Sequence, residues 1–407
     1  MADLDDIIVD ERKTRKFLRL VCCLRYTQGK NSISTFNLLY IISVYTLLLI
    51  VVVQGVVLAY STDDIVQKVE SIHYVLTIII VISYMSNELY NNSNLDQAWK
   101  LINLAYNEFS KDRDENRQIH VEINVSSVKT NKLFCFLMSS SCVGYLLFAP
   151  MRQLFTEEDS SARKLPVPLY MPFDTSDNFG FSLGMAWEAI SLFYICGVST
   201  SIHQSFRGIM GRLRGELKLL NNSIKGIHVR AEKYQGKVDD TEKLEAHFQF
   251  LVYKCLREDI VHHQMLLEYY SLTKIYLGTI LLLFIFLSSI ILGAVGFLIT
   301  KPNSNTEDII KFLAIVTAEL FFVYQLCWEG ERVAEESGQI FNNLFNIPWN
   351  AYDRNVKGCI RIMLCGTIKP IRLKTSIFNV EASLETYNWV ITTAFQYFNL
   401  LRNIKSG

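Results

Sequence analysis

Polar residues whose types and spacing suit an ion pathway lie in the last apolar segment of the chain, residues 383–402. A helix turns by about 100° per residue, so one sector of about 80° collects a polar stripe: Glu385, Asn388, Thr392, Gln396 and Asn399. A polar stripe along a membrane helix has to face protein or water rather than lipid. It therefore either bonds neighbouring helices of one bundle or lines an aqueous path between several copies, and periodicity alone does not separate the two.

The composition indicates that a membrane surrounds such a helix. Half of the 407 residues are hydrophobic and only 20% are charged. The apolar residues come in blocks of about 20, the length that crosses a bilayer as a helix. The net charge is zero, so no nucleic acid or other polyanionic partner is implied. The N-terminal segment is too charged for a secretory signal.

An all-α membrane protein with seven spans is the predicted fold. The spans are residues 37–60, 71–89, 133–151, 182–203, 275–299, 309–328 and 383–402. The connections after even-numbered spans are long and lie with the N-terminus on one side of the membrane. Helical patterns run on past the membrane there, so spans four, five and six are expected to continue as helices and to pack together.

The long-loop side is expected to be cytoplasmic. The distribution of Lys and Arg leans only slightly this way. All nine cysteines lie in the spans or on this side, as free thiols in a reducing compartment would. Three glycosylation sequons, at Asn91, Asn124 and Asn221, also lie on this side and would be silent there.

No signal for an enzyme or a cofactor is found. The sequence contains no phosphate-binding loop and no G-x-S-x-G motif. His262 and His263 have carboxylates nearby, but adjacent helical side chains point about 100° apart, which does not favour a metal site.

Three stretches resemble insect odorant receptors. SLETY…AFQYFNLLR at the C-terminus is similar to the start and end of that family's last helix. LPVPLYMPFDTSDNFGF, residues 165–181, is similar to its long extracellular loop. Residues 352–380 resemble the cytoplasmic helix and connector before the last span. The resemblance extends over the seven-span layout and is densest in the C-terminal third.

The resemblance implies an odorant-gated, non-selective cation channel subunit that forms a heterotetramer with a co-receptor in the plasma membrane of olfactory sensory neurons. A volatile odorant, membrane lipid and permeating cations are the implied partners, with no cofactor. The implied layout is a cytoplasmic segment 1–36, spans one to six in 37–328 with extracellular loop 152–181 and cytoplasmic loop 204–274, cytoplasmic anchor helices 329–382, a pore-lining span 383–402 and an extracellular tail 403–407.

The same resemblance implies site residues. Leu400, with Ile404 one turn further out, matches the family's apolar gate, and Gln396, Thr393 and Tyr397 belong with it on the pore-facing helix. Arg402 is expected to point into the lipid headgroups. The odorant pocket is implied among spans two, three, four and six, with these candidates: His73, Tyr74, Ile78, Ser141, Gly144, Tyr145, Phe148, Met185, Glu188, Leu192, Thr317 and Phe321. Glu188 and Glu319 are carboxylates inside spans and could be neutral, paired or facing water.

The alternative is a seven-helix receptor of opposite orientation that signals through a cytosolic partner. Cys135 and Cys255 could then form an extracellular bridge, and the three sequons would carry glycans. Against this alternative, span three ends in MRQLF rather than an acidic-Arg-aromatic triplet, and the last span has no N-P-x-x-Y motif. Orientation is the observation that separates the two readings.

Overall fold

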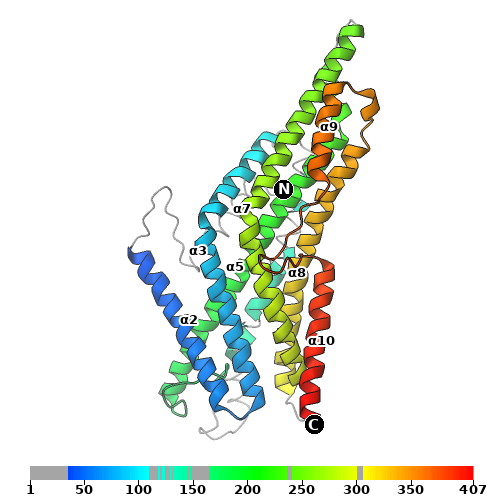
Figure 1. Ribbon diagram of the computed structural model, residues 1–407. Helices are drawn as coiled ribbons and strands as arrows, with labels where there is room; N and C mark the ends of the chain where they lie inside the picture. The colour runs from blue at the N-terminus through cyan, green and yellow to red at the C-terminus, as the bar shows by residue number, and fades with distance from the viewer. Residues whose placement is uncertain are drawn as a thin grey trace.

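Long helices make up most of the part of the chain that the structure describes (Figure 1). This computed structural model describes residues 35–109, 165–235, 241–299 and 306–406, and parts of 118–147. The helices are α2 (Thr35–Ser61), α3 (Ile65–Phe109), α5 (Asn178–Lys225), α6 (Ile227–Gln235), α7 (Thr241–Ile299), α8 (Thr306–Phe345), η2 (Trp349–Ala351), α9 (Arg354–Thr367) and α10 (Leu384–Ser406). The predicted all-α membrane fold is confirmed.

Five of the described helices are long and apolar enough to cross a membrane, namely α2, α3, α5, α7 and α8. They correspond to predicted spans one, two, four, five and six. Of the third predicted span, 133–151, a shorter apolar helix over Lys132–Gly144 is partly described. The last span corresponds to α10, which has 23 residues. Because of its polar stripe, α10 is less hydrophobic than the other five helices and is not counted among them.

Helices α5, α7 and α8 run on well past the membrane, as predicted for spans four, five and six. They have 48, 59 and 40 residues, whereas a bilayer needs about 20. Helix α3 also continues, to Phe109, which was not predicted. In this extension Leu95, Ala98 and Ile102 recur at helical spacing and all are buried.

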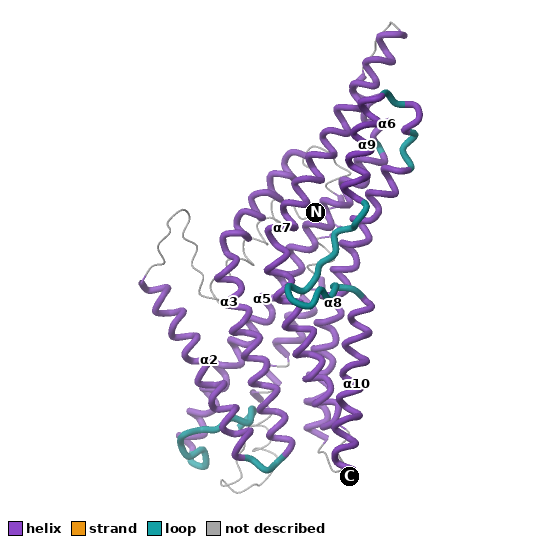
Figure 2. The backbone as a smooth tube through the Cα atoms, in the orientation of Figure 1, coloured by secondary structure: helices purple, strands orange, loops and turns teal. Residues whose placement is uncertain are grey.

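The molecule is elongated along its helices and has a lower and an upper half in the view of Figures 1 and 2. In the lower half of the view, α2, α3, α5, α7, α8 and α10 form a bundle. In the upper half, α3, α5, α7 and α8 continue and are joined by α6 and α9. Helix α7 contacts α3, α5, α6, α8, α9 and α10, and so is the central element of both halves. The α2–α3 connection and the C-terminus lie at the lower end.

Short polar residues begin two of the helices. The side chain of Asp177 precedes α5 and accepts a hydrogen bond from the backbone N–H of Gly180 at 3.0 Å. Asp353 precedes α9 and accepts from the N–H of Val356 at 2.8 Å. Each carboxylate satisfies an N–H group that has no partner within the helix, which fixes where the helix starts.

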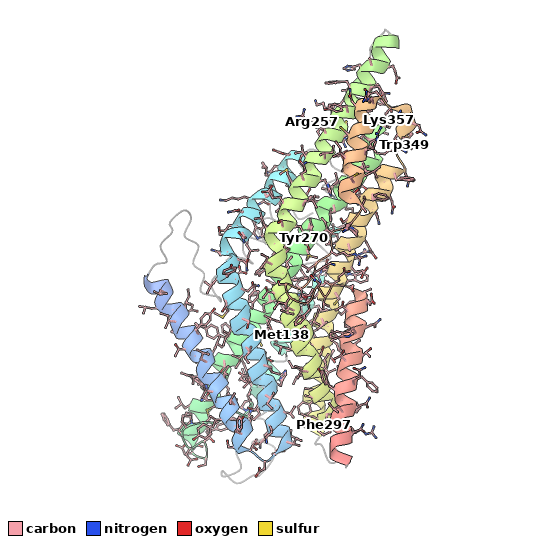
Figure 3. All side chains as sticks on the ribbon, viewed as in Figure 1. Met138, Arg257, Tyr270, Phe297, Trp349 and Lys357 are labelled. Carbon is pink, nitrogen blue, oxygen red and sulfur yellow. The ribbon has the colours of Figure 1, made fainter. Side chains whose placement is uncertain are left out.

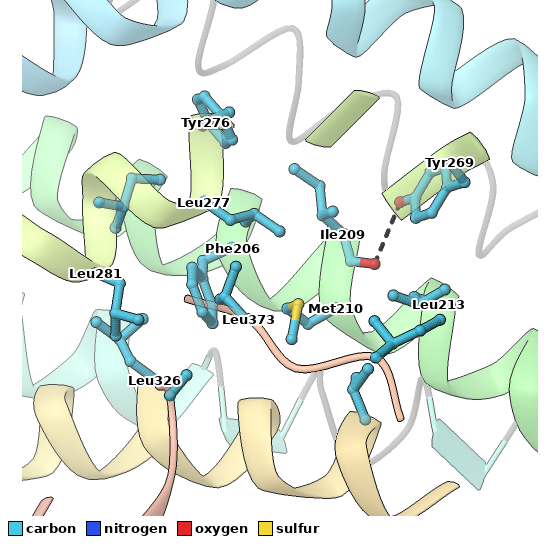
Figure 4. Close-up of a cluster of buried hydrophobic side chains, with 14 of the residues drawn as sticks. Phe206, Ile209, Met210, Leu213, Tyr269, Tyr276, Leu277, Leu281, Leu326 and Leu373 are labelled. Atoms are coloured by element: carbon cyan, nitrogen blue, oxygen red, sulfur yellow. Dashed lines mark hydrogen bonds between the residues drawn. The ribbon is translucent and has the colours of Figure 1, made fainter. Parts of the chain in front are cut away.

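The connector between α9 and α10, residues 368–383, is pressed between α7 and α8. Leu373 of the connector lies in the buried apolar cluster that α5, α7 and α8 form around it (Figure 4). A Cβ atom built on Gly278 of α7 would lie 2.6 Å from the carbonyl oxygen of Lys374, and one built on Gly330 of α8 would collide with Ala382. Both helices therefore need glycine where the connector crosses them.

A buried ionic cluster joins α5 to α8 just above the bundle. Arg207 lies 3.3 Å from one carboxylate oxygen of Glu329 and donates to Oε1 of Gln325 at 2.6 Å. Arg214 lies 3.2 Å from the other oxygen of Glu329. The side chains of Arg207 and Glu329 are only 3% and 2% exposed. One carboxylate therefore pairs with two guanidinium groups in a site that water barely reaches.

Helix α10 approaches α7 closely at Gly293. A Cβ atom there would lie 2.7 Å from Cβ of Tyr397 and 3.1 Å from the carbonyl oxygen of Ala394, whereas at Gly296 the nearest atom, in Phe398, is 3.8 Å away. Gly293→Ala is therefore expected to lower the free energy of unfolding by about 1–3 kcal/mol, because the added methyl group overpacks this contact. Thermal stability of the detergent-solubilised protein measures this cost. Gly296→Ala is the matched control and should be tolerated; equal effects of the two would contradict the close approach.

Candidate functional site

A cavity of ≈ 160 Å³ lies inside the lower bundle. Helices α3, α5, α7 and α8, the described part of the third span and the segment before α5 all contribute to its wall. The wall is mainly apolar and aromatic, and its apolar lining residues are Val69, Tyr74, Phe134, Met138, Val167, Pro168, Leu192, Ile195, Phe284, Val295, Leu298, Phe312, Ala314, Ile315, Ala318 and Phe322. Met138 marks the level of the cavity in Figure 3. Such a wall suits a small apolar ligand.

Few polar groups line the same cavity. They are Glu70, His73, Thr77, Cys142, Cys196, Ser199 and Glu319. The Thr77 hydroxyl donates to the backbone carbonyl of His73 at 2.9 Å, so its hydrogen-bond donor already has a partner within the protein. The Ser288 hydroxyl donates to Glu319 at 2.8 Å. These few groups would orient a ligand, while the apolar wall would supply most of its binding energy.

The segment before α5 covers one end of the cavity. The carboxylate of Glu188 accepts a hydrogen bond from the backbone N–H of Val167 at 3.0 Å, and the Trp187 indole N–H donates to Gln54 of α2 at 2.9 Å. Val167 is buried and lines the cavity. The intramembrane carboxylate of Glu188 therefore has a structural partner, and it holds the covering segment in place.

Three of the predicted ligand-binding residues line this cavity, namely His73, Tyr74 and Leu192. Six others do not: Ile78, Gly144, Met185, Glu188, Thr317 and Phe321. Ser141, Tyr145 and Phe148 lie outside the described residues. The structure thus brings together candidates from spans two and four, and it adds span five, which the prediction left out.

The residues that do not line the cavity have other surroundings. Ile78 is fully buried in the main apolar cluster. Thr317 is exposed, and its hydroxyl donates to the carbonyl of Leu313 at 2.8 Å. Phe321 stacks on Phe134 with ring centroids 6.4 Å apart. A polar or aromatic type inside a span does not by itself say which way the residue points.

The sequence prediction missed several residues that line the cavity, although their helical spacing places them on one face of a helix. Phe134, Met138 and Cys142 recur every fourth residue on the third span, and Phe312, Ile315, Glu319 and Phe322 share one face of α8. His203 of α5 lies behind this wall, where its ring stacks on Phe134 at 4.1 Å. Neither ring nitrogen of His203 has a hydrogen-bond partner among the described residues.

The polar stripe of α10 faces away from the rest of the chain. Glu385, Asn388, Thr392 and Gln396 are exposed and Asn399 is half-buried. The side of α10 that packs on α7 and α8 carries Thr386, Val390 and Ala394 instead, at every fourth position. The interpretation of the stripe as hydrogen-bonding glue within one bundle is therefore wrong for a single chain. Its partners have to be water or another subunit.

The predicted pore residues lie on or beside this outward surface. Leu400 is 55% exposed and Tyr397 is 43% exposed, although Cβ of Tyr397 also contacts the Gly293 region of α7. Gln396 is exposed and Thr393 is half-buried. Ile404 lies in α10, but the environment of its side chain is outside the described part. Arg402 is exposed, and its expected place in the headgroup region stays a prediction.

The two adjacent histidines are packed in the upper half of the molecule. Nε2 of His262 lies 3.0 Å from a carboxylate oxygen of Glu216, and its ring stacks on Phe109 at 4.5 Å. Burial, with the neighbouring His262, lowers the pKa of His263 to about 4. His263 is therefore neutral at physiological pH, and His262 bridges α3, α5 and α7.

Two of the three sequons cannot carry a glycan in this fold. Asn91 is 1% exposed and its amide donates to Asn87, while Asn221 is 2% exposed and its amide donates to the backbone carbonyl of Glu336 at 2.8 Å. Asn124 lies outside the described residues. Cys135 and Cys255 are both free thiols. The described residues therefore contain no Cys135–Cys255 bridge, and two of the three sequons are too buried to accept a glycan. The receptor of opposite orientation would use both features.

Glycosylation mapping is expected to locate the two sides. Asp159→Asn creates an Asn-Ser-Ser acceptor in loop 152–181, and we expect a glycan there that peptide N-glycosidase removes, seen as a shift on a gel. Asn91→Gln, Asn124→Gln and Asn221→Gln should leave the mobility of the wild-type chain unchanged. A glycan on wild-type Asn124 would contradict a cytoplasmic long-loop side.

Sequence comparisons identify related proteins. A family model described as 7tm Odorant receptor matches residues 64–395. Odorant receptor 13a of Drosophila melanogaster is 22% identical over 303 residues, which are 69% of this chain and 69% of that protein. Odorant receptor 63a of the same species is 30% identical over 102 residues, 25% of this chain and 24% of that protein.

A solved structure has the same fold. The insect olfactory receptor OR5 from Machilis hrabei, in complex with eugenol, superposes with a TM-score of 0.75 at 14% sequence identity. The match covers 98% of this chain and 100% of that one. A second structure of that receptor gives a TM-score of 0.73 over 97% and 98% of the two chains. At this identity the likeness establishes the fold.

Proposed function

Because the chain belongs to the insect odorant receptor family, as the match over residues 64–395 shows, we propose that it is the odorant-tuning subunit of a ligand-gated, non-selective cation channel. It is a membrane receptor and not an enzyme. In this proposal a volatile ligand binds in the bundle cavity, and a pore lined by α10 opens in an assembly with a co-receptor. The subunit works in the plasma membrane of olfactory sensory neurons, with its N-terminus in the cytoplasm.

One observation carries the channel proposal. The polar stripe of α10 turns away from the helices of its own chain, and a stripe of this kind is unfavourable against lipid. Placing several copies of α10 around a common axis turns the stripes toward water that ions can use. An isolated seven-helix receptor would leave the exposed members of this stripe facing hydrocarbon. The stripe therefore favours an assembly, and the proposed assembly is a tetramer.

The cavity supports the receptor half of the proposal. It is small, has a mainly apolar wall and is covered at one end by the segment that Glu188 holds. A volatile molecule with an apolar body fits these properties. Helices α7 and α8 both line the cavity and both pack against α10. A ligand that changes the positions of α7 and α8 would thereby reach the proposed pore helix without an intermediate partner.

Whole-cell recording tests the proposal. The chain is expressed alone and with the insect co-receptor, and a panel of volatile odorants is applied with GTP-dependent signalling intact or blocked. We expect a fast inward current that requires the co-receptor and survives the block. A current abolished by the block would indicate a receptor that signals through a cytosolic partner. Absence of current despite surface expression would count against the channel.

A further inference from the structure

Glu319 is an acidic side chain on the cavity-facing side of α8. It lies among Phe312, Ile315 and Phe322, which recur at helical spacing and all line the cavity. The surface beside the carboxyl group is therefore aromatic and aliphatic. A carboxyl group in such surroundings is costly unless donors are directed at its oxygens.

The protein itself supplies one such donor. The Ser288 hydroxyl of α7 donates to Oε2 of Glu319 at 2.8 Å, and it is the one donor to Glu319 among the described residues. A carboxylate has about four acceptor positions on its two oxygens. Acceptor capacity toward the cavity therefore remains after the bond from Ser288 is made.

The other residues of the cavity wall also favour a ligand that donates a hydrogen bond. A second carboxylate, Glu70, lines the cavity, and no Lys or Arg of the described residues does. Five aromatic rings, those of Tyr74, Phe134, Phe284, Phe312 and Phe322, also line the cavity. Ring faces are electron-rich and attract positive or partly positive groups. A ligand with only acceptors, such as an ether, cannot donate to either carboxylate.

We infer that Glu319 selects ligands whose head group donates a hydrogen bond, namely alcohols and primary amines with an apolar body. This inference rests on the proposed receptor function and specifies the class of its ligands. The apolar body lies against the aromatic wall, and the head group donates to the carboxyl group beside Ser288. An acceptor-only isomer of the same size fills the same volume but leaves the carboxyl group without its donor, so it binds more weakly.

Ligands matched in size separate the effect of the head group from that of the apolar body. The probes are 1-hexanol, hexylamine and ethyl butyl ether, and in an aromatic series 2-phenylethanol, 2-phenylethylamine and benzyl methyl ether. In cells with the co-receptor, half-maximal concentrations for the alcohol or the amine are expected to be about tenfold or more below that of the ether, which corresponds to a hydrogen bond to a charged or strongly polar group.

Three variants test the residue. Glu319→Leu should remove the preference for donors and keep the response to the ether. Glu319→Gln keeps an acceptor oxygen but no charge, so it should retain responses to alcohols and lose those that depend on a protonated amine. Ser288→Ala frees an acceptor position and should raise sensitivity to donors without changing the ether response. Glu335→Gln, at an exposed site of the same helix, is the matched control.

The outcomes separate the inference from the proposed function. A donor preference that Glu319→Leu abolishes and Glu335→Gln leaves intact supports it. Equal potency of ethers and alcohols, or a donor preference that Glu319→Leu and Ser288→Ala both leave unchanged, overturns it while the receptor function stands. Silence of the wild-type chain to all six probes, with surface expression and a co-receptor that responds to its own agonist, counts against both.

Discussion

Glu329→Gln is expected to lower the free energy of unfolding by about 3–5 kcal/mol, because it removes one partner of a buried ion pair and leaves the opposite charges uncompensated. Glu329 is the carboxylate between Arg207 and Arg214, which are 3% and 11% exposed. Glutamine keeps the shape and a hydrogen-bond acceptor. The loss therefore measures charge burial rather than packing.

The thermal-inactivation midpoint of the detergent-solubilised protein, followed by size-exclusion chromatography, checks this prediction. The matched control is Glu335→Gln on the same helix, whose pair with Arg332 at 3.3 Å is about half exposed. Exposed pairs contribute about 0–1 kcal/mol, so this variant should melt close to wild type. Equal melting of the two variants would mean that the α5–α8 cluster is solvated rather than buried.

Leu400→Thr is expected to raise the current in the absence of ligand. In the proposed channel, Leu400 forms the apolar ring that excludes water, and a hydroxyl at this position favours wetting. If replacing leucine by threonine removes about 1.5 kcal/mol of apolar stabilisation from the closed state, the closed-to-open ratio falls roughly tenfold. Basal holding current, blocked by a cation-channel pore blocker, is the measurement.

Ile391→Thr provides the comparison for Leu400→Thr. Ile391 is on the same helix, is 39% exposed and lies about 180° from Leu400 around the helix axis. The same change of side chain there should leave basal current at the wild-type level. Raised basal current in both variants would indicate a general loosening of α10, and no change in either would place the gate elsewhere.

Apolar blocks were sufficient to predict the spans, because a helix needs about 20 consecutive, mainly apolar residues to cross a bilayer. Apolar stretches of that length are rare in other kinds of structure. The continuation of α5, α7 and α8 followed from periodic apolar residues beyond those blocks. The extension of α3 has the same periodicity at Leu95, Ala98 and Ile102 but lies among many polar residues, and it was missed. What decided it was the partner surface on α7, which a single segment does not reveal.

The residues that line the cavity were predicted less well than the spans, for a geometric reason. On α8, Thr317 lies about 160° from Glu319 around the helix, so a candidate chosen by residue type pointed away from the cavity. His73 and Tyr74, two of the predicted ligand-binding residues, do line the cavity, and their binding of a ligand stays a prediction. The direction of each face follows from packing between helices that are distant in sequence.

Helix α7 can be considered as a lever. Its 59 residues form a rod about 88 Å long, while the bilayer accounts for about 30 Å of that length. Phe284, Val295 and Leu298 line the cavity near one end, and the helix contacts α6 and α9 toward the other. If the rod stays straight, a tilt of 1° about the cavity end moves the far end by about 1.5 Å, given that length. A displacement at the ligand too small to disturb side-chain packing would thus be magnified at the opposite end of the molecule.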